Sequence, residues 1–385
     1  MSAVSFLNDA ASEMIYPLLP LFLTGTLGAG AALLGVIEGA AESASSLLKL
    51  ASGWLADRTG RRKPLTVLGY AVAALTRPLV AVAAAPWHVL GIRLADRVGK
   101  GLRTAPRDAL LAESIAPHQR GAAFGLHRAA DHAGAVAGPL IASALLLAWP
   151  GELRRVFALA LVPGLLTVAL LVWKVRETPR AAPPPAASAP RTRGWRATGP
   201  VLPRYLAVLA LFTLGNASDA FLLLRARDAG VAVALIPLLW GALHVSKSAW
   251  SVVGGRWSDR VGPRRAIVSG WLVYALVYAG FAAVGAAWQV WALFLAYGLF
   301  FGLTEGPEKA LLAALAPAGR QGSAFGAYHA AVGMAALPAS ILFGVLWQAA
   351  GPELAFATGA ALALAAALLL PLALRGAPIT PGGEA

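Results

Sequence analysis

The chain has 385 residues, of which 58% are hydrophobic and only 13% are charged, and its mean hydropathy is +0.68. This composition excludes a disordered chain and argues against a soluble globular enzyme, because soluble domains carry about 25% charged residues. The sequence contains no cysteine, which excludes disulfides, thiolate metal sites and cysteine nucleophiles. These exclusions leave a polytopic membrane protein made of helices. Twelve spans of about 20 residues each would occupy about 240 residues and leave only short loops.

Apolar runs, separated by short polar or Gly/Pro segments, predict six membrane spans in the first half of the chain. They cover approximately residues 4–26, 30–52, 64–84, 86–106, 121–148 and 155–174. The first run is acidic and no basic segment precedes it, so we expect a retained span and not a cleaved signal peptide. Residues 1–175 are therefore expected to form an N-terminal six-helix bundle.

A segment rich in Pro, Ala and Arg follows, and it has no apolar periodicity. We interpret residues 176–202 as an exposed linker. Six further apolar runs cover approximately residues 203–224, 231–253, 266–285, 287–313, 323–349 and 353–374. The predicted fold class is therefore an all-α membrane protein with twelve transmembrane helices in two six-helix repeats. The second bundle would occupy residues 203–375, with a tail at 376–385.

The basic residues are concentrated in alternate loops. The loops at 25–32 and 83–87 contain none, whereas the linker and the segments after spans two, eight and twelve are basic. Arg154, Arg155, Arg225 and Arg227 depart from this pattern without reversing it. The positive-inside rule then places both termini and the linker in the cytoplasm, in a bacterial-type inner membrane. The same rule attributes the net charge of +14 to topology and contact with anionic lipids, and not to nucleic-acid binding.

The two halves repeat one another. GWLADRTGRRKP at 53–64 matches GRWSDRVGPRRA at 255–266, a shift of 202 residues. APRDALLAESIAP at 105–117 matches GPEKALLAALAP at 306–317, a shift of 201 residues. Two matches at nearly one offset indicate an internal duplication. Repeated six-span halves that hold a substrate between them are typical of transporters.

The loop after the second span resembles the signature loop of the major facilitator superfamily. The residues that carry the resemblance are Gly53, Asp57, Arg58, Gly60, Arg61 and Arg62, with a degenerate copy at Asp259 and Arg260. The resemblance extends over essentially the whole chain. It implies alternating access by two rocking bundles, and it implies that this loop is a conformational latch in which Asp57 is the foremost residue. The other interpretation is that the basic residues only set the topology.

Two further motifs resemble those of proton-linked exporters. Arg97-x-x-Lys100-Gly101 is similar to the family pattern R-x-x-Q-G, with lysine in place of glutamine. The fifth span resembles the antiporter motif through Gly125, Gly134, Gly138 and Pro139. Small residues at this spacing let helices pack closely and Pro139 bends the helix, so generic packing is the alternative interpretation.

Ionisable residues within spans are costly, and each is therefore a functional candidate. For proton coupling we select Glu13, Glu38 and Glu42, with Arg97 as the modulating cation, because a desolvated carboxyl group binds its proton more tightly. Glu38 and Glu42 share a helix face, where two like charges bring no structural gain. The candidates for substrate binding are Asp9, Tyr16, Arg93, Asp131, Asp219, Trp240, His244 and Glu305. For each of these, a permanent ion pair or plain packing is the alternative.

Together these features predict a secondary transporter, and not an enzyme, that exports a small molecule in exchange for protons. The acidic residues of spans one and two favour a cation, although Arg77 and Arg93 could equally meet an anion. Uptake by proton symport or uniport, metal-ion efflux, and a sensor or assembly protein that does not transport are the alternatives. We expect a monomer whose partners are its substrate, protons and lipids, driven by the proton gradient without a cofactor, a metal centre or nucleic acid.

Overall fold

The structure, a computed structural model, describes residues 1–59, 62–113, 120–175, 201–316 and 321–376. Within these ranges the side chains of residues 49–59, 62, 105, 108–109, 111–113, 120–126, 128 and 321–323 are left out of the description. The described residues are almost entirely helical and include no β-strand. This agrees with the predicted all-α fold class.

In the N-terminal half, the first span is a chain of short helical pieces because Pro17 and Pro20 interrupt regular helix. Its pieces are α1 (Ser2–Ile15), η1 (Tyr16–Leu18), α2 (Leu19–Leu21) and η2 (Phe22–Thr26). The next spans are α3 (Ala31–Thr59), α4 (Arg62–Thr76) continued by η3 (Arg77–Val82), α5 (Pro86–Glu113) and α6 (Arg120–Ala148). The sixth span consists of α7 (Leu153–Leu159) and α8 (Leu161–Lys174).

The C-terminal half repeats this succession. It contains α9 (Val201–Gly215), α10 (Ala220–Asp228), η6 (Val233–Leu235), α11 (Ile236–Val261), α12 (Pro263–Ala283), α13 (Ala287–Leu315) and α14 (Gln321–Ala373). A bend at Gly351, where φ is 89°, divides α14 into two legs. The described helices thus provide all twelve predicted spans, as six legs in each half. Eight helical segments of the described chain, one of them the bent α14, are long and apolar enough to cross a membrane.

The seventh span differs from the continuous helix that its apolar run predicts. Residues 216–219 separate α9 from α10. The hydroxyl of Tyr274 donates to the carbonyl oxygen of Gly215 at 3.1 Å and lies 3.2 Å from Oδ1 of Asn216. Because a membrane supplies no water to open backbone groups, a side-chain partner of this kind makes a helix break tolerable. The break places polar residues between the two halves, and hydropathy alone does not reveal it.

The two halves meet along a small number of helix pairs. The first leg of α14 packs along α3, α6 packs against α11, and α10 packs against α2. A Cβ atom on Gly35 of α3 would collide with the carbonyl oxygen of Ser340, and Ser43 Oγ donates to the carbonyl oxygen of Gly333 at 2.6 Å. Near the far end of the pair, the Gln348 side chain accepts a hydrogen bond from the Ala32 backbone N–H at 3.3 Å.

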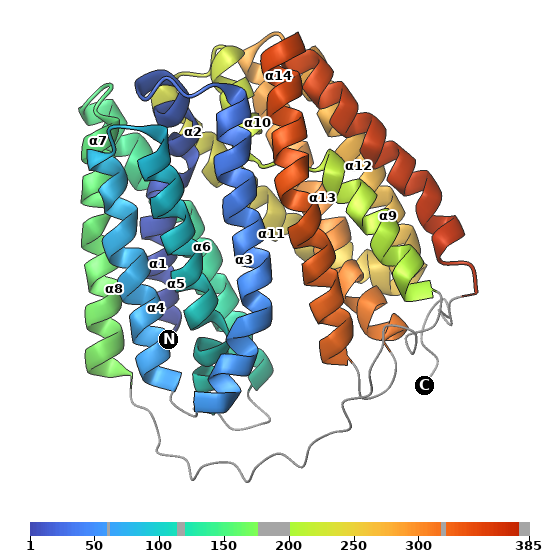
Figure 1. The fold of residues 1–385 in the computed structure, drawn as a ribbon, viewed down its shortest axis with the longest axis horizontal. Helices are drawn as coiled ribbons and strands as arrows, with labels where there is room; N and C mark the ends of the chain where they lie inside the picture. Colours follow the sequence, from blue (N-terminus) through green and yellow to red (C-terminus); the bar gives the residue numbers. More distant parts are fainter. Residues whose placement is uncertain (60–61, 114–119, 176–200, 317–320, 377–385) are drawn as a thin grey trace.

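The halves are not parallel. Figure 1 shows their helices converging near the start of α3 and diverging toward the end of α8 and the start of α9, the two helices between which the linker falls in the sequence. We call these the closed end and the linker end. The close contacts between α3 and α14 begin at Ala31 and Gly344, at the closed end.

Replacing Gly35 with leucine is expected to open the closed end, because the new side chain cannot fit against the Ser340 backbone. The readout is the distance between spin labels on Val82→Cys and Trp288→Cys, which are exposed positions of the two halves in this otherwise cysteine-free chain. The distance should lengthen in Gly35→Leu. Gly91→Leu is the control, because a Cβ atom at Gly91 would meet no atom within 4 Å. An unchanged distance distribution in Gly35→Leu would contradict the inferred contact.

Candidate functional site

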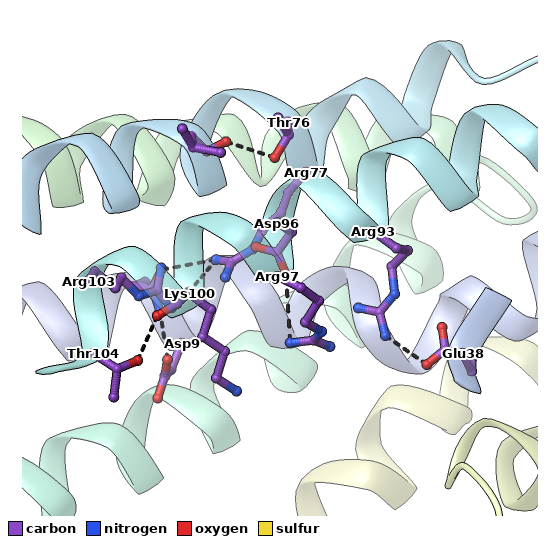
Figure 2. A network of polar contacts seen from close by, with 12 residues as sticks. Asp9, Glu38, Thr76, Arg77, Arg93, Asp96, Arg97, Lys100, Arg103 and Thr104 are labelled. Atoms are coloured by element: carbon purple, nitrogen blue, oxygen red, sulfur yellow. Dashed lines mark hydrogen bonds and ion pairs between the residues drawn. The ribbon is translucent and has the colours of Figure 1, made fainter. Parts of the chain in front are cut away.

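A buried ionic network ties three segments of the N-terminal half together (Figure 2). Asp96 on α5 lies 2.7 Å from Nε of Arg77 on η3 and 3.8 Å from Nη1 of Arg97. Nη1 of Arg77 also donates to Oδ1 of Asn8 on α1 at 3.0 Å, and so does Nη1 of Arg103 at 3.0 Å. Each partner satisfies donors that would otherwise be buried without acceptors, so the network fixes the packing of these segments.

A second buried ion pair links α5 to α3. Nη2 of Arg93 lies 2.7 Å from Oε2 of Glu38 (Figure 2), and the Arg93 guanidinium lies 5.4 Å from the ring centroid of Tyr16. The hydroxyl of Ser218, in the break of the seventh span, is 3.5 Å from the same Glu38 oxygen. The two carboxylates that share a face of α3 therefore have different surroundings, because Glu42 is exposed while Glu38 is buried.

The third feature is a contact between the halves around Glu13. Nε1 of Trp240 on α11 donates to Oε2 of Glu13 on α1 at 2.7 Å. Nε2 of His244, one turn along α11, is 3.9 Å from the same oxygen. The rings of Trp240 and Tyr16 lie 5.1 Å apart. The structure thus brings together one predicted coupling residue and three predicted substrate residues, which come from both halves.

Two predicted residues of the C-terminal half lie in separate surroundings. Asp219, at the start of α10, accepts a hydrogen bond from the Tyr297 hydroxyl at 2.9 Å. Glu305 on α13 is 3.7 Å from Nζ of Lys247, which also lies 3.5 Å from the ring centroid of Phe301. Glu305 therefore has a cationic partner, whereas Asp219 accepts from a neutral hydroxyl.

Asp9 and Asp131 are placed inside the N-terminal half, where α1 packs against α6. Asp9 accepts a hydrogen bond from Nδ2 of Asn8 at 2.8 Å, and Oδ1 of Asp131 is 3.9 Å from Nε2 of His127. The predicted substrate residues therefore do not form one cluster. Among the described residues, no group of three or more His, Cys, Asp or Glu side chains is placed to hold a metal ion.

The glycine motif of the fifth span lies at this same crossing of α6 and α1. A Cβ atom on Gly134 would collide with the carbonyl oxygen of Phe6, and one on Gly138 would collide with that of Ala10. Gly125 belongs to the part of α6 whose side chains are left out. Pro139 faces the other half, because its Cβ lies 3.5 Å from where a Cβ of Gly241 would be.

The predicted latch falls mostly outside the described residues. The structure does not describe Gly60 and Arg61. It also leaves out the side chains of Asp57, Arg58 and Arg62 and the surroundings of Gly53. In the second copy, Asp259 and Arg260 are exposed near the end of α11, which terminates at Gly262 with a φ of 85°.

The predicted site residues do not include several residues that the structure places in these networks. Asn8 accepts from two arginines, Asp96 is the ion-pair partner of Arg77, and Tyr297 and Ser218 approach Asp219 and Glu38. The charge of Asp96 within a span was a usable signal. Neutral Asn8, Tyr297 and Ser218 carry no such signal, because only the arrangement of the helices shows what they face.

Comparison with known proteins matches the Major Facilitator Superfamily over residues 1–307 and 220–385 of this chain. An uncharacterised MFS-type transporter of Methanocaldococcus jannaschii is 32% identical over 373 residues, which cover 95% of this chain and 92% of that protein. Multidrug resistance protein MdtH of Photorhabdus laumondii is 34% identical over only 155 residues, 39% of this chain and 38% of that protein.

Solved structures share the fold at low sequence identity. A peptide transporter of the POT type has a TM-score of 0.81 at 14% identity, with 97% of this chain and 93% of that one covered. A bacterial homologue of the human lysosomal transporter Spinster, in an inward-facing and occupied conformation, has a TM-score of 0.73 at 16% identity, with coverage of 97% and 94%.

Proposed function

The chain belongs to the major facilitator superfamily, and on that premise we propose that it exports a small molecule in exchange for protons by alternating access. The observation that carries the proposal is the hydrogen bond from Trp240 to Glu13. The carboxyl group of Glu13, in the N-terminal half, accepts this hydrogen bond from the C-terminal half. Its protonation state therefore affects the relative position of the two halves. The partial similarity to a protein named for multidrug resistance favours export over uptake by symport or uniport.

Glu13 would couple the proton to movement in the following way. As a carboxylate, it accepts a charge-assisted hydrogen bond from Trp240, which is stronger than a bond to a neutral acceptor. Protonation weakens this tie between the halves, and deprotonation restores it. Glu38 and Glu42 on α3 are the further carboxylates of the proposed relay, and Arg97 modulates it from α5.

The surroundings of the buried charges favour a cationic substrate. Arg77 and Arg93 each lie 2.7 Å from a carboxylate, so both positive charges already have partners. Glu13 and Asp219, in contrast, accept from the neutral donors of Trp240 and Tyr297. A cation entering between the halves would compensate these carboxylates.

We assign the substrate contacts to Tyr16, Trp240 and His244 at the interface, with Asp9, Arg93, Asp131, Asp219 and Glu305 around it. Tyr16 and Trp240 offer aromatic faces to a cation. The absence of a three-ligand metal cluster among the described residues makes an organic cation the better candidate than a metal ion.

The remaining assignments complete the proposal. The linker end would face the cytoplasm of a bacterial-type inner membrane, which makes the present conformation inward-facing. Asp57 and the basic residues of its loop would act as the latch of the opposite conformation. The protein would work as a monomer, without cofactor or enzymatic activity, using the proton gradient.

Purified protein in liposomes tests the proposed direction of coupling. Tetraphenylphosphonium is the probe cation, and potassium with valinomycin holds the membrane potential at zero. Antiport predicts uptake when the liposome interior is acidic and none when the gradient is reversed. Uptake driven only by an acidic exterior would indicate symport, and equal uptake under both gradients would indicate uniport; either result would contradict the proposal.

A further inference from the structure

A further buried carboxyl group lies in the C-terminal half. Glu308 on α13 is 8% exposed. Its Oε2 accepts a hydrogen bond from the hydroxyl of Tyr328 on α14 at 2.8 Å, and its Oε1 accepts one from Nε1 of Trp271 on α12 at 3.4 Å. The buried hydroxyl of Tyr205 on α9 has no hydrogen-bond partner among the described residues.

Glu308 shares with Glu13 and Asp219 the feature that its hydrogen-bond partners are neutral. The buried carboxylates Asp96 and Glu38 each lie 2.7 Å from an arginine nitrogen. Over the described part of the chain, no Lys, Arg or His nitrogen lies within the 4.0 Å of an ion pair with Glu308. Glu305, one turn earlier on the same helix, does have such a partner in Lys247 of α11.

The groups around Glu308 come from three other helices and from α13 itself. Tyr205 projects from α9, Trp271 from α12 and Tyr328 from α14, while Glu305 and Lys309 are its titratable neighbours on α13. Lys309 is exposed, and Lys247 of α11 is held by Glu305. Lys309, the cation of α13 among these groups, therefore lies at the surface and does not form an ion pair with Glu308.

We propose that Glu308 is a proton-binding site of the C-terminal half. An ionised carboxylate without a cationic partner is costly inside a membrane domain, and binding a proton removes that cost. The site suits both protonation states, because a tyrosine hydroxyl donates to a carboxylate and accepts from a carboxylic acid. Proton uptake would reverse the hydrogen bond to Tyr328 and leave the acid hydrogen-bonded.

The repeat shows that this site is particular to one half. With the shift of 201 residues, Arg107 occupies the position of Glu308 in the N-terminal half. The hydrogen bond to Tyr328 connects Glu308 to the interface between the two halves, because Tyr328 lies on the leg of α14 that packs along α3. Proton binding at Glu308 therefore acts on a helix that joins the halves, independently of Glu13.

Infrared spectroscopy of the full chain in lipid nanodiscs tests the site without any transport. Difference spectra between acidic and alkaline buffer report the carbonyl stretch of protonated carboxylic acids. Glu308→Gln, which keeps the size and an acceptor oxygen, should lose one component of this titrating band. Glu305→Gln is the matched control and should retain that component, because Glu305 is paired with Lys247 and its side chain is 48% exposed.

Tyr328→Phe gives a second reading that does not depend on the folding of Glu308→Gln. It should shift the frequency of the same component, because the acid loses a hydrogen-bond partner. A titrating band that is unchanged in folded Glu308→Gln, or unchanged in frequency in Tyr328→Phe, would overturn the proposal. Since no substrate or gradient is involved, this outcome is separate from the fate of the proposed antiport.

Discussion

Replacing Glu13 with glutamine is expected to abolish transport against a gradient while leaving substrate exchange intact. Glutamine imitates the protonated acid permanently, so it still accepts the hydrogen bond from Trp240 but cannot release a proton. The halves could then rock with substrate bound, and no proton would be carried. The measurement is a pair of assays on reconstituted protein, one of accumulation driven by a pH gradient and one of equilibrium exchange.

Two further variants show whether the effect belongs to the contact between the halves. Trp240→Phe keeps an aromatic ring beside Tyr16 but removes the donor to Glu13, and it should alter the pH dependence of accumulation without abolishing it. Glu152→Gln, at a carboxylate that is 48% exposed and paired with Arg155, should behave as wild type. Normal accumulation by Glu13→Gln would remove Glu13 from the coupling mechanism.

Asp96→Ala is expected to have the largest effect on stability, a loss of about 3–5 kcal/mol in the free energy of unfolding. The substitution leaves the Arg77 guanidinium buried without its anionic partner, and Asn8 offers only neutral oxygens. Thermal unfolding of the purified protein measures the change. Asp96→Asn, which retains an acceptor for Nε of Arg77, should lose less.

A double variant distinguishes two contributions to the free energy of unfolding: the penalty for burying the Arg77 charge without a partner, and the stabilisation that the Arg77–Asp96 ion pair provides. In Arg77→Met with Asp96→Leu, both charges are gone, so the protein should be more stable than Asp96→Ala. If the double variant is as unstable as Asp96→Ala, then the unpaired charge of Arg77 is not the cause of the lost stability and this interpretation is wrong.

The sequence predicted the architecture because apolar length and repeat spacing decide it. The start and end of α13, Ala287–Leu315, differ from the predicted 287–313 only at the last turn. The break at residues 216–219 escaped prediction, because the hydropathy of the seventh span is continuous and the hydroxyl of Tyr274 that supports the break lies two spans later.

The sequence indicates which residue types are candidates for the site, but it does not indicate how they pair. Glu38 and Glu42 look alike in sequence, since both lie on one face of α3. Only the approach of α5 gives Glu38 an arginine partner, while Glu42 stays exposed. The bond between Glu13 and Trp240 likewise depends on how the two halves meet, and no local pattern in either span carries that information.

The most direct test of proton-coupled export is proton movement in inverted membrane vesicles that contain the wild-type chain or Glu13→Gln. A pH-sensitive dye reports an imposed gradient while organic cations, anions, neutral drugs and metal ions are added in turn. Proton antiport through Glu13 predicts discharge by organic cations in wild-type vesicles and none in Glu13→Gln vesicles. Equal discharge in both preparations, or discharge by none of the compounds, would contradict it.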